Sequence, residues 1–213
     1  MTKLLFVRHG ETLQNKLRIF QGQSGAGLTE KGREQAGLLA ARLRATRVAF
    51  SALYTSDLER AAETASILGD ALGLIPKAHP GLREVALGRW EGLHEDEIRA
   101  AMPEEWAAWR NGEDIARGGG ECLADVTARM ARAAEEIATE HEGRTVVLVS
   151  HGAAIKSFAA HVLSTKTTRL RALRPVSNTG ACLFERGRDG GYSLVVYNDT
   201  THLGDALQAA LES

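Results

Sequence analysis

Two histidines stand directly after short apolar runs, and glycine follows each of them. His9 comes after KLLFV, with Arg8 beside it, and His151 comes after RTVVLVS. Such runs predict buried strands, and in an open α/β sheet ligands bind beyond the carboxyl ends of the strands. If the two strands are parallel, both imidazoles face one crevice, where Gly10 and Gly152 let the backbone approach an anion closely. The alternative is two structural histidines, each bonded to a carbonyl group.

An arginine near the start of a predicted helix adds a further group. Arg60 follows the strand predicted at 50–56, and Ser56 and Glu59 have the spacing of a capping box that would begin its helix. At that end of the sheet a guanidinium faces the same crevice and suits bidentate binding of phosphate oxygens. On a solvated helix the same arginine would instead pair with Glu59 or Glu63.

Arginines, imidazoles and helix N-termini around one crevice form an anion site, for which phosphate is the best-suited occupant. A neutral imidazole can attack phosphorus, while positive charges stabilise the equatorial oxygens of the transition state. A carboxyl group must then protonate the leaving oxygen. Spacing leaves three candidates open: Glu11, Glu84 and Glu91. The attraction must be local, because a formal net charge of −1 favours neither nucleic acid nor an anionic membrane as a partner.

The remaining sequence alternates apolar runs with helical periodicity. Thr29 is the expected N-cap of a helix whose apolar face includes Leu39 and Leu43, and Gly73 is the expected end of the Arg60 helix. Further elements are expected as a strand at 74–79, a helix at about 121–142, a helix at 153–163, and strands at 180–186 and 192–198. This alternation predicts one α/β domain, residues 1–213, with a largely parallel sheet.

Residues 85–120 are less regular and are expected to form a substrate cap. Trp106 and Trp109 are three residues apart on an expected helix and therefore share a face. They form either an aromatic lid over the site or an anchor that holds the segment to the core. Four arginines of the region either read a second carboxylate or phosphate of the substrate or are simply solvated: Arg83, Arg89, Arg110 and Arg117.

Composition narrows the class of protein. Apolar residues make up 44% of the chain and charged residues 25%, as in globular soluble proteins. Cys122 and Cys182 are too few for a disulfide framework, and the apolar run before Arg8 is too short for a signal peptide or a membrane span. A cytoplasmic location is expected. The seven histidines contain no HExxH or comparable ligand cluster, so no metal is expected.

The segment from Arg8 to Thr12, with Asn15 after it, resembles the RHG[ET]xxN signature of the histidine phosphatase superfamily, the phosphoglycerate-mutase-like phosphatases. Further similar segments follow in the expected order over essentially the whole chain: 28–36, 56–65, 82–92, 118–121, 149–155, 177–180 and 198–203. Cys122 departs from the pattern, because serine usually follows GGE, and this puts details of substrate contact in doubt.

The resemblance implies a role for each matching residue. His9 is the implied nucleophile that becomes phosphohistidine, and Glu84 is the implied proton donor and later base. The implied phosphate site also contains Arg8, Arg60 and His151, with Asn15, Gln21, Gly22 and Gly152 lining the phosphate or substrate. The implied fold is a three-layer α/β/α sandwich around a mixed sheet. The resemblance implies no cofactor, and related enzymes are often homodimers.

The same resemblance favours a phosphatase over a mutase. The Glu84 segment, LREVALGRWEG, is similar to the phosphatase branch, whereas bisphosphoglycerate-dependent mutases carry a pattern nearer LNERHYGxLxG. The chain between Glu84 and VSHG is also too short for the long insertion of the mutases, so water can reach phosphohistidine. Hydrolysis of a small phosphomonoester is therefore predicted. The alternatives are a cofactor-dependent phosphoglycerate mutase and a non-catalytic, phosphate-binding regulatory protein.

Overall fold

A six-stranded mixed sheet forms the centre of the computed structural model, which describes residues 1–164 and 173–204. In spatial order the strands are β3 (Pro76–Ala78), β2 (Phe50–Thr55), β4 (Thr145–Ser150), β1 (Thr2–Arg8), β5 (Ala181–Arg186) and β6 (Tyr192–Asp199). The first four strands are parallel, β5 is antiparallel to β1, and β6 is antiparallel to β5. The predicted, largely parallel mixed sheet is confirmed.

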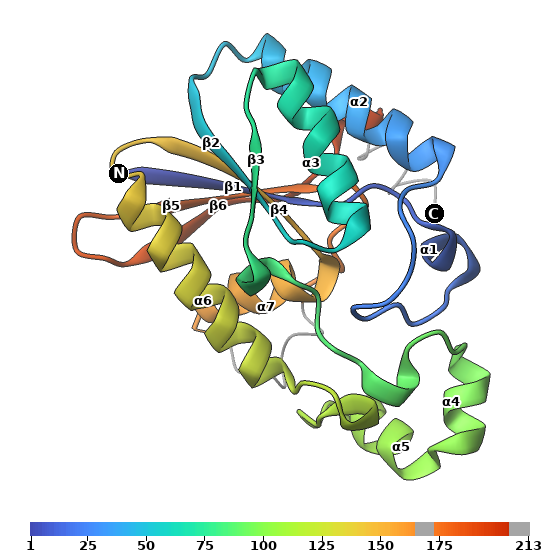
Figure 1. The fold of residues 1–213 in the computed structure, drawn as a ribbon. Helices are drawn as coiled ribbons and strands as arrows, with labels where there is room; N and C mark the ends of the chain where they lie inside the picture. Colours follow the sequence, from blue (N-terminus) through green and yellow to red (C-terminus); the bar gives the residue numbers. More distant parts are fainter. Residues whose placement is uncertain (165–172, 205–213) are drawn as a thin grey trace.

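Helices cover both faces of this sheet (Figure 1). On one face lie α2 (Glu30–Ala45) and α3 (Glu59–Leu72), and on the other lie α6 (Leu123–Glu140) and α7 (Gly152–Val162). The short helix α1 (Leu13–Leu17) follows β1, and the turn η5 (Thr201–Leu203) follows β6. The arrangement is the predicted three-layer sandwich. Within the described ranges, no helix is both long and apolar enough to cross a bilayer.

Alternating side chains of the central strands build two cores. In β1, Leu4 and Phe6 are fully buried in the core shared with α6 and α7, whereas Val7 is fully buried in the core shared with α2 and α3. The same alternation continues in β4, where Leu148 belongs to the first core and Val149 to the second. Because successive side chains of a strand point to opposite faces, a continuous apolar run is what a sheet buried on both sides requires.

The starts of two helices test the capping predictions. Thr29 is the N-cap of α2, and its side chain accepts a hydrogen bond from the Gly32 amide. The capping box predicted for Ser56 is wrong, because the N-cap of α3 is Leu58, without a side-chain cap. The Ser56 amide instead donates to the Val149 carbonyl (2.9 Å) and so continues the pairing of β2 with β4. The helix can therefore begin only after this residue.

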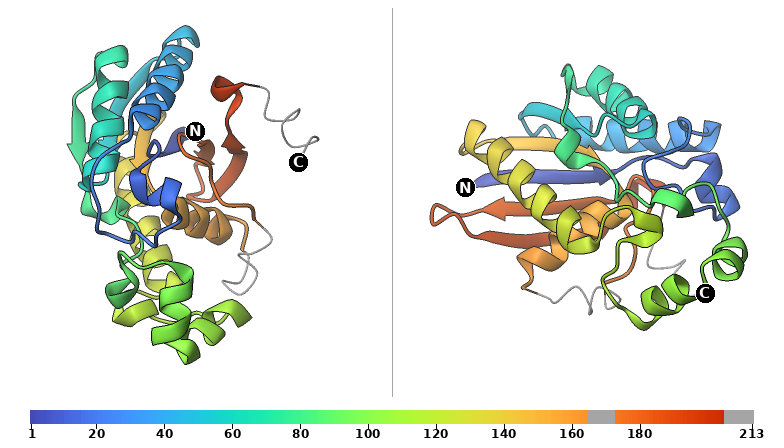
Figure 2. Two further views of the ribbon diagram at one scale, coloured as in Figure 1. Left: turned by 90° about the vertical axis from the view of Figure 1, so that its right-hand side faces the viewer. Right: turned by 60° about the horizontal axis from the view of Figure 1, so that its bottom comes forward.

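The region 85–120 contains more helix than its sequence predicts. It includes η2 (Gly88–Trp90), α4 (Glu95–Ala101), α5 (Pro103–Asn111) and η3 (Arg117–Gly119), and it follows η1 (Pro80–Leu82). Both views in Figure 2 show α4 and α5 standing apart from the three layers of the sandwich.

An aromatic cluster ties α5 to the rest of the protein. The rings of Trp106 and Trp109 are 4.8 Å apart, and both contact Phe20 and Trp90. Trp90 and Trp106 are buried within the core that faces α6 and α7. Of the two interpretations of the tryptophans, the structure therefore favours the anchor over the lid.

Candidate active site

The two histidines meet because their strands are neighbours. β1 and β4 are paired in parallel, with Arg8 opposite Ser150, so that His9 and His151 are the first residues beyond the paired ends. Their ring centroids are 5.1 Å apart, and both side chains are buried. The convergence predicted from the two apolar runs is thus present in the fold.

The His9 ring is held as a neutral imidazole with a defined tautomer. Its Nδ1 lies 2.7 Å from the Gly10 carbonyl oxygen, which can only accept, so Nδ1 carries the proton. Burial, and next the positive charges of Arg8 and Arg60, hold the pKa of His9 well below its ordinary value of 6.5. At neutral pH the ring is therefore uncharged, and its Nε2 has a free electron pair for attack on phosphorus.

Small side chains fix the loop that carries His9. The Gly10 amide donates to Thr64 Oγ1 (3.1 Å), which in turn donates to the Arg60 carbonyl in α3 (2.7 Å). A Cβ atom on Gly10 would lie 2.4 Å from the Gly32 carbonyl oxygen at the start of α2. Glycine is thus required here for close packing, and the packing joins the His9 loop to both helices of one layer.

Two arginines are held by backbone carbonyl groups beside His9. Arg60 is 1% exposed and donates to the carbonyls of Ser24 (2.9 Å) and Gly22 (2.6 Å). Arg8 donates to the Val176 carbonyl (2.7 Å). Burial lowers the pKa of Arg60 to about 10 and also lowers that of Arg8, yet both stay charged at neutral pH. Arg60 therefore belongs to the site and does not pair with the glutamates of its own helix.

Several buried side-chain nitrogen atoms in this cluster have no hydrogen-bond partner in the part of the chain that the structure describes. They are the Nε atoms of Arg8 and Arg60 and both ring nitrogens of His151. Burial, followed by the charge of Arg60, holds the pKa of His151 well below its ordinary value. Gly152 lies against Arg8, since a Cβ there would be 3.3 Å from Nε. Buried polar groups in native proteins are normally bonded, and an oxyanion could accept hydrogen bonds from the two arginine Nε–H groups and from the one N–H of a neutral His151.

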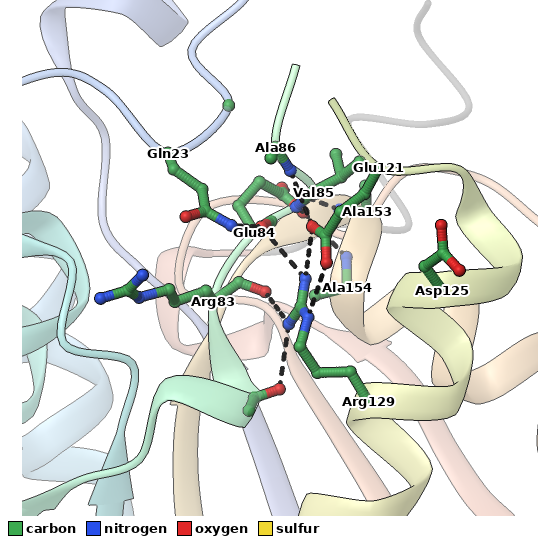
Figure 3. Close-up of polar contacts among 12 residues, drawn as sticks. Gln23, Arg83, Glu84, Val85, Ala86, Glu121, Asp125, Arg129, Ala153 and Ala154 are labelled. Atoms are coloured by element: carbon green, nitrogen blue, oxygen red, sulfur yellow. Dashed lines mark hydrogen bonds and ion pairs between the residues drawn. The ribbon is translucent and has the colours of Figure 1, made fainter. Parts of the chain in front are cut away.

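Glu84 is bonded to the start of the helix that follows His151. Its Oε1 accepts from the amides of Val85 and Ala154, and its Oε2 accepts from the amide of Ala153, each at 3.0 Å (Figure 3). The negative charge of Glu84 also offsets part of the effect of burial on the pKa of Arg8 and of Arg60. This carboxyl group is thus fixed close to both arginines.

The other two candidate carboxyl groups have different partners. Glu11 accepts from the Thr29 hydroxyl (3.0 Å), with Lys31 at 3.6 Å. Glu91 accepts from the amides of Gln23 (2.9 Å) and Leu87 (3.0 Å). Of the three, Glu84 is the carboxyl group that is bonded to the His151 helix. We call Arg8, His9, Arg60, Glu84 and His151 together the His9 site.

The predicted lining residues Asn15 and Gln21 bond to other protein groups. Asn15 Oδ1 accepts from the Thr12 amide (3.3 Å) and from the side-chain amide of Asn178 (3.0 Å), while Gln21 Oε1 accepts from the Thr12 hydroxyl (3.2 Å). The same Asn178 amide donates to the His9 carbonyl (3.1 Å). Asn15 and Asn178 thus hold the backbone of the His9 loop.

Reasoning from the sequence did not identify a guanidinium group that binds the backbone around Glu84. Arg129, on α6, donates to the carbonyls of Gly81 (3.0 Å), Arg83 (2.8 Å) and Glu84 (3.2 Å), and it forms two bonds with the Glu121 carboxylate (Figure 3). In the sequence it is one arginine on the polar side of an amphipathic helix, and nothing in the local pattern distinguishes it from a solvated residue. We call Arg129 and Glu121 the Arg129 clamp.

Comparison with known proteins gives matches over most of the chain. The profile of the histidine phosphatase superfamily (branch 1) matches residues 4–200. A glucosyl-3-phosphoglycerate phosphatase from Mycobacterium tuberculosis is 38% identical over 83% of this chain and 82% of its own. The structure of Bacillus stearothermophilus YhfR matches with a TM-score of 0.88, 36% identity, and coverage of 95% of this chain and 100% of that one. A mutant phosphoserine phosphatase from Entamoeba histolytica, in complex with phosphoserine, matches with a TM-score of 0.84, 30% identity and the same coverage.

Proposed function

The chain belongs to the histidine phosphatase superfamily, and from this premise we propose that it hydrolyses a small phosphomonoester through a phosphorylated His9. The observation that carries the proposal is the state of the His9 ring. It is neutral, its Nδ1 proton is bonded to the Gly10 carbonyl, and the ring lies 5.1 Å from that of His151 and within the influence of the charges of Arg8 and Arg60. The names of the relatives support small phosphorylated metabolites as substrates.

In the first step the phosphoryl group moves from the ester to His9. The Nε2 electron pair forms a bond to phosphorus while the bond from phosphorus to the ester oxygen breaks. Arg8, Arg60 and His151 bind the equatorial oxygens, whose charge the buried guanidinium groups stabilise. Glu84, protonated for this step, gives its proton to the departing oxygen. Within the described residues its Oε2 accepts one hydrogen bond, from the Ala153 amide, which leaves an electron pair to hold that proton.

In the second step water replaces the alcohol. The Glu84 carboxylate takes a proton from a water molecule, whose oxygen attacks phosphorus as the bond to Nε2 breaks. Phosphate leaves, and both His9 and Glu84 return to their starting states. The protein groups supply both the positive charge and the proton transfer, so we propose that turnover needs neither a metal ion nor a cofactor. Activity that EDTA abolishes and a divalent cation restores would contradict this.

The phosphoenzyme is the species to measure. We expect rapid-quench mass spectrometry of the protein, mixed with a phosphomonoester, to detect a phosphoryl group on His9. We expect His9→Ala to form no phosphoenzyme and to release no phosphate. The matched control is His94→Asn, since His94 is exposed and caps α4, away from the His9 site. Unchanged phosphate release by His9→Ala would refute the proposal, because hydrolysis would then proceed without a phosphorylated His9.

Mutase activity is the second candidate, because the same pocket chemistry serves both reactions. The protein is incubated with 3-phosphoglycerate and 2,3-bisphosphoglycerate, and isomer interconversion is followed together with release of inorganic phosphate. We expect release to be the faster process. If interconversion is faster, the phosphohistidine is transferring its group back to an acid and the protein is a mutase.

A further inference from the structure

Arg117 is a buried cation whose Nη2 has no hydrogen-bond partner in the described residues. It is 7% exposed and begins η3, outside the His9 site. Burial lowers the pKa of Arg117, and the charges of Glu84 and Asp114 offset only part of this effect. Arginine is rarely buried unless it is paired, because removing its charge from water is costly. The side chain is therefore poised for an anionic partner from outside the chain.

The other arginines of this region do not share this state. Each has a partner at the protein surface: Arg83 binds Asp57, Arg89 binds Glu105, and Arg110 lies over the ring of Trp106. Of the four arginines that the sequence offered as readers of a second anion, Arg117 is the one that is both buried and unsatisfied at a donor atom.

The backbone around Arg117 is fixed to the Glu84 segment. The Glu121 amide donates to the Ala86 carbonyl (2.9 Å), and the Gly118 amide donates to the Glu105 carboxylate (2.9 Å). Gly118 has a φ of +58°, and a Cβ there would lie 2.3 Å from the carbonyl oxygen of Leu87. The backbone that carries Arg117 is therefore held beside the residues that carry the proposed proton donor.

We propose that Arg117 binds a carboxylate on the leaving group of the substrate. This rests on the proposed function, because Glu84 must reach the departing oxygen and so places the leaving group on its own side of the site. The bond from the Glu121 amide to the Ala86 carbonyl and the packing of Gly118 against Leu87 hold the Arg117 segment against the Glu84 segment, on that same side. The substrate class is thus a phosphomonoester of a hydroxy acid, with the phosphoryl group on His9 and the acid on Arg117.

A carboxylate fits this position better than a second phosphate. Its two oxygens match the planar fork of a guanidinium, and it brings a single negative charge. A phosphate would bring nearly two charges. Those charges would lie near the carboxylates of Glu84 and Asp114, which already interact with Arg117.

Phosphoserine and phosphoethanolamine differ by one carboxylate and form a matched pair of probes. We expect the protein to prefer phosphoserine in kcat/KM by about 10- to 100-fold, as for one charge-assisted contact. Arg117→Gln should remove this preference by lowering kcat/KM for phosphoserine, whereas kcat/KM for phosphoethanolamine should change by no more than about two-fold. Arg117→Lys keeps the charge without the fork, and its preference should be intermediate. The surface control Arg89→Gln should keep the full preference.

The outcomes separate the two proposals. If wild-type protein and Arg117→Gln discriminate equally, or if wild-type protein shows no preference for phosphoserine, the role of Arg117 is refuted while phosphatase activity stands. If Arg117→Gln instead loses a preference for fructose 1,6-bisphosphate over fructose 6-phosphate, the second anion is a phosphate and the carboxylate assignment is wrong. If no ester is hydrolysed, p-nitrophenyl phosphate included, the proposed function itself fails and this inference with it.

Discussion

Replacing Arg129 by methionine should disable the proton donor from a distance. The methionine keeps much of the side-chain length on α6 but removes all five hydrogen bonds that the guanidinium makes to Gly81, Arg83, Glu84 and Glu121. Among the described residues, Arg129 forms no hydrogen bond with His9 or with the Glu84 carboxylate. It binds the backbone from which Glu84 projects, so it acts as a positioning residue.

The size of the effect follows from these contacts. The side chains of Arg129 and Glu121 are 21% and 25% exposed, so the substitution leaves a mostly buried carboxylate without its cation, held by the hydrogen bond from the Ala86 amide (2.9 Å). Breaking a buried pair in this way costs about 3–5 kcal/mol, and the residual exposure points to the lower end, about 3 kcal/mol. A positioned acid contributes about 10²–10⁴ in rate, and its partial displacement should lower kcat by about 10- to 100-fold.

Two esters with different leaving groups distinguish a displaced Glu84 from a general disruption of the fold. p-Nitrophenyl phosphate has a leaving group that departs without a proton, whereas phosphoethanolamine has an alkoxide that needs one. We expect Arg129→Met to lower kcat on phosphoethanolamine by about ten-fold more than on p-nitrophenyl phosphate. The double variant Arg129→Met/Glu121→Gln should recover stability, since the carboxylate is gone, without recovering this activity. Arg132→Met, exposed on the same helix, is the control.

Equal losses on the two esters would refute this reasoning. They would show that the clamp maintains the whole fold and has no particular effect on the acid. Recovery of both stability and activity in the double variant would also refute it, because the carbonyl bonds of Arg129 are still missing there.

Three further expectations concern stability. Gly32→Ala should lower the free energy of unfolding by at least about 2 kcal/mol, since a Cβ would lie 2.2 Å from a backbone oxygen, whereas Gly37→Ala, with open space, should raise it by about 0.5–1 kcal/mol; urea denaturation measures both. Burial holds the pKa of His9 and of His151 below 6.5, so below that pH the unfolded chain binds protons that the folded protein does not, and denaturation at a series of pH values should show stability falling as pH drops. Phe20→Ala should open the tryptophan cluster, lower the free energy of unfolding by about 2 kcal/mol or more and shift the tryptophan fluorescence. An unchanged fluorescence spectrum would count against the role of the tryptophans as an anchor.

The layers of the fold could be predicted from the hydrophobic pattern, because central strands such as β4 are buried on both faces. The helix expected at 121–142 is α6 (Leu123–Glu140), and the run at 144–150 contains β4. The order of the strands in the sheet could not be predicted in this way, because an apolar run does not determine which strand it pairs with. The capping error at Ser56 has the same cause, since a long-range bond to β4 decides where α3 begins.

The site was predictable where position in the chain fixes position in the fold. His9 and His151 each end a strand, so parallel pairing alone brings them together. Glu84 lies in a loop, and spacing could not separate it from two other carboxyl groups; resemblance to a family was needed. Arg117 was one of four candidate arginines that the sequence could not separate, because burial of a side chain in a loop depends on the fold. Arg129 was missed, because its role depends on contacts with residues tens of positions away, such as Gly81.

The pairing of β1 also has a consequence for the order of folding. β1 is hydrogen-bonded on one side to β4 and on the other to β5, so both neighbours lie more than a hundred residues further along the chain. Closing such distant contacts is slow, and until it happens both edges of β1 and apolar residues such as Phe6 remain available to other chains. A ribosome-bound chain that has not yet added β4 holds His9 without His151. Assembly of the sheet and assembly of the phosphoryl-transfer machinery are therefore the same late event.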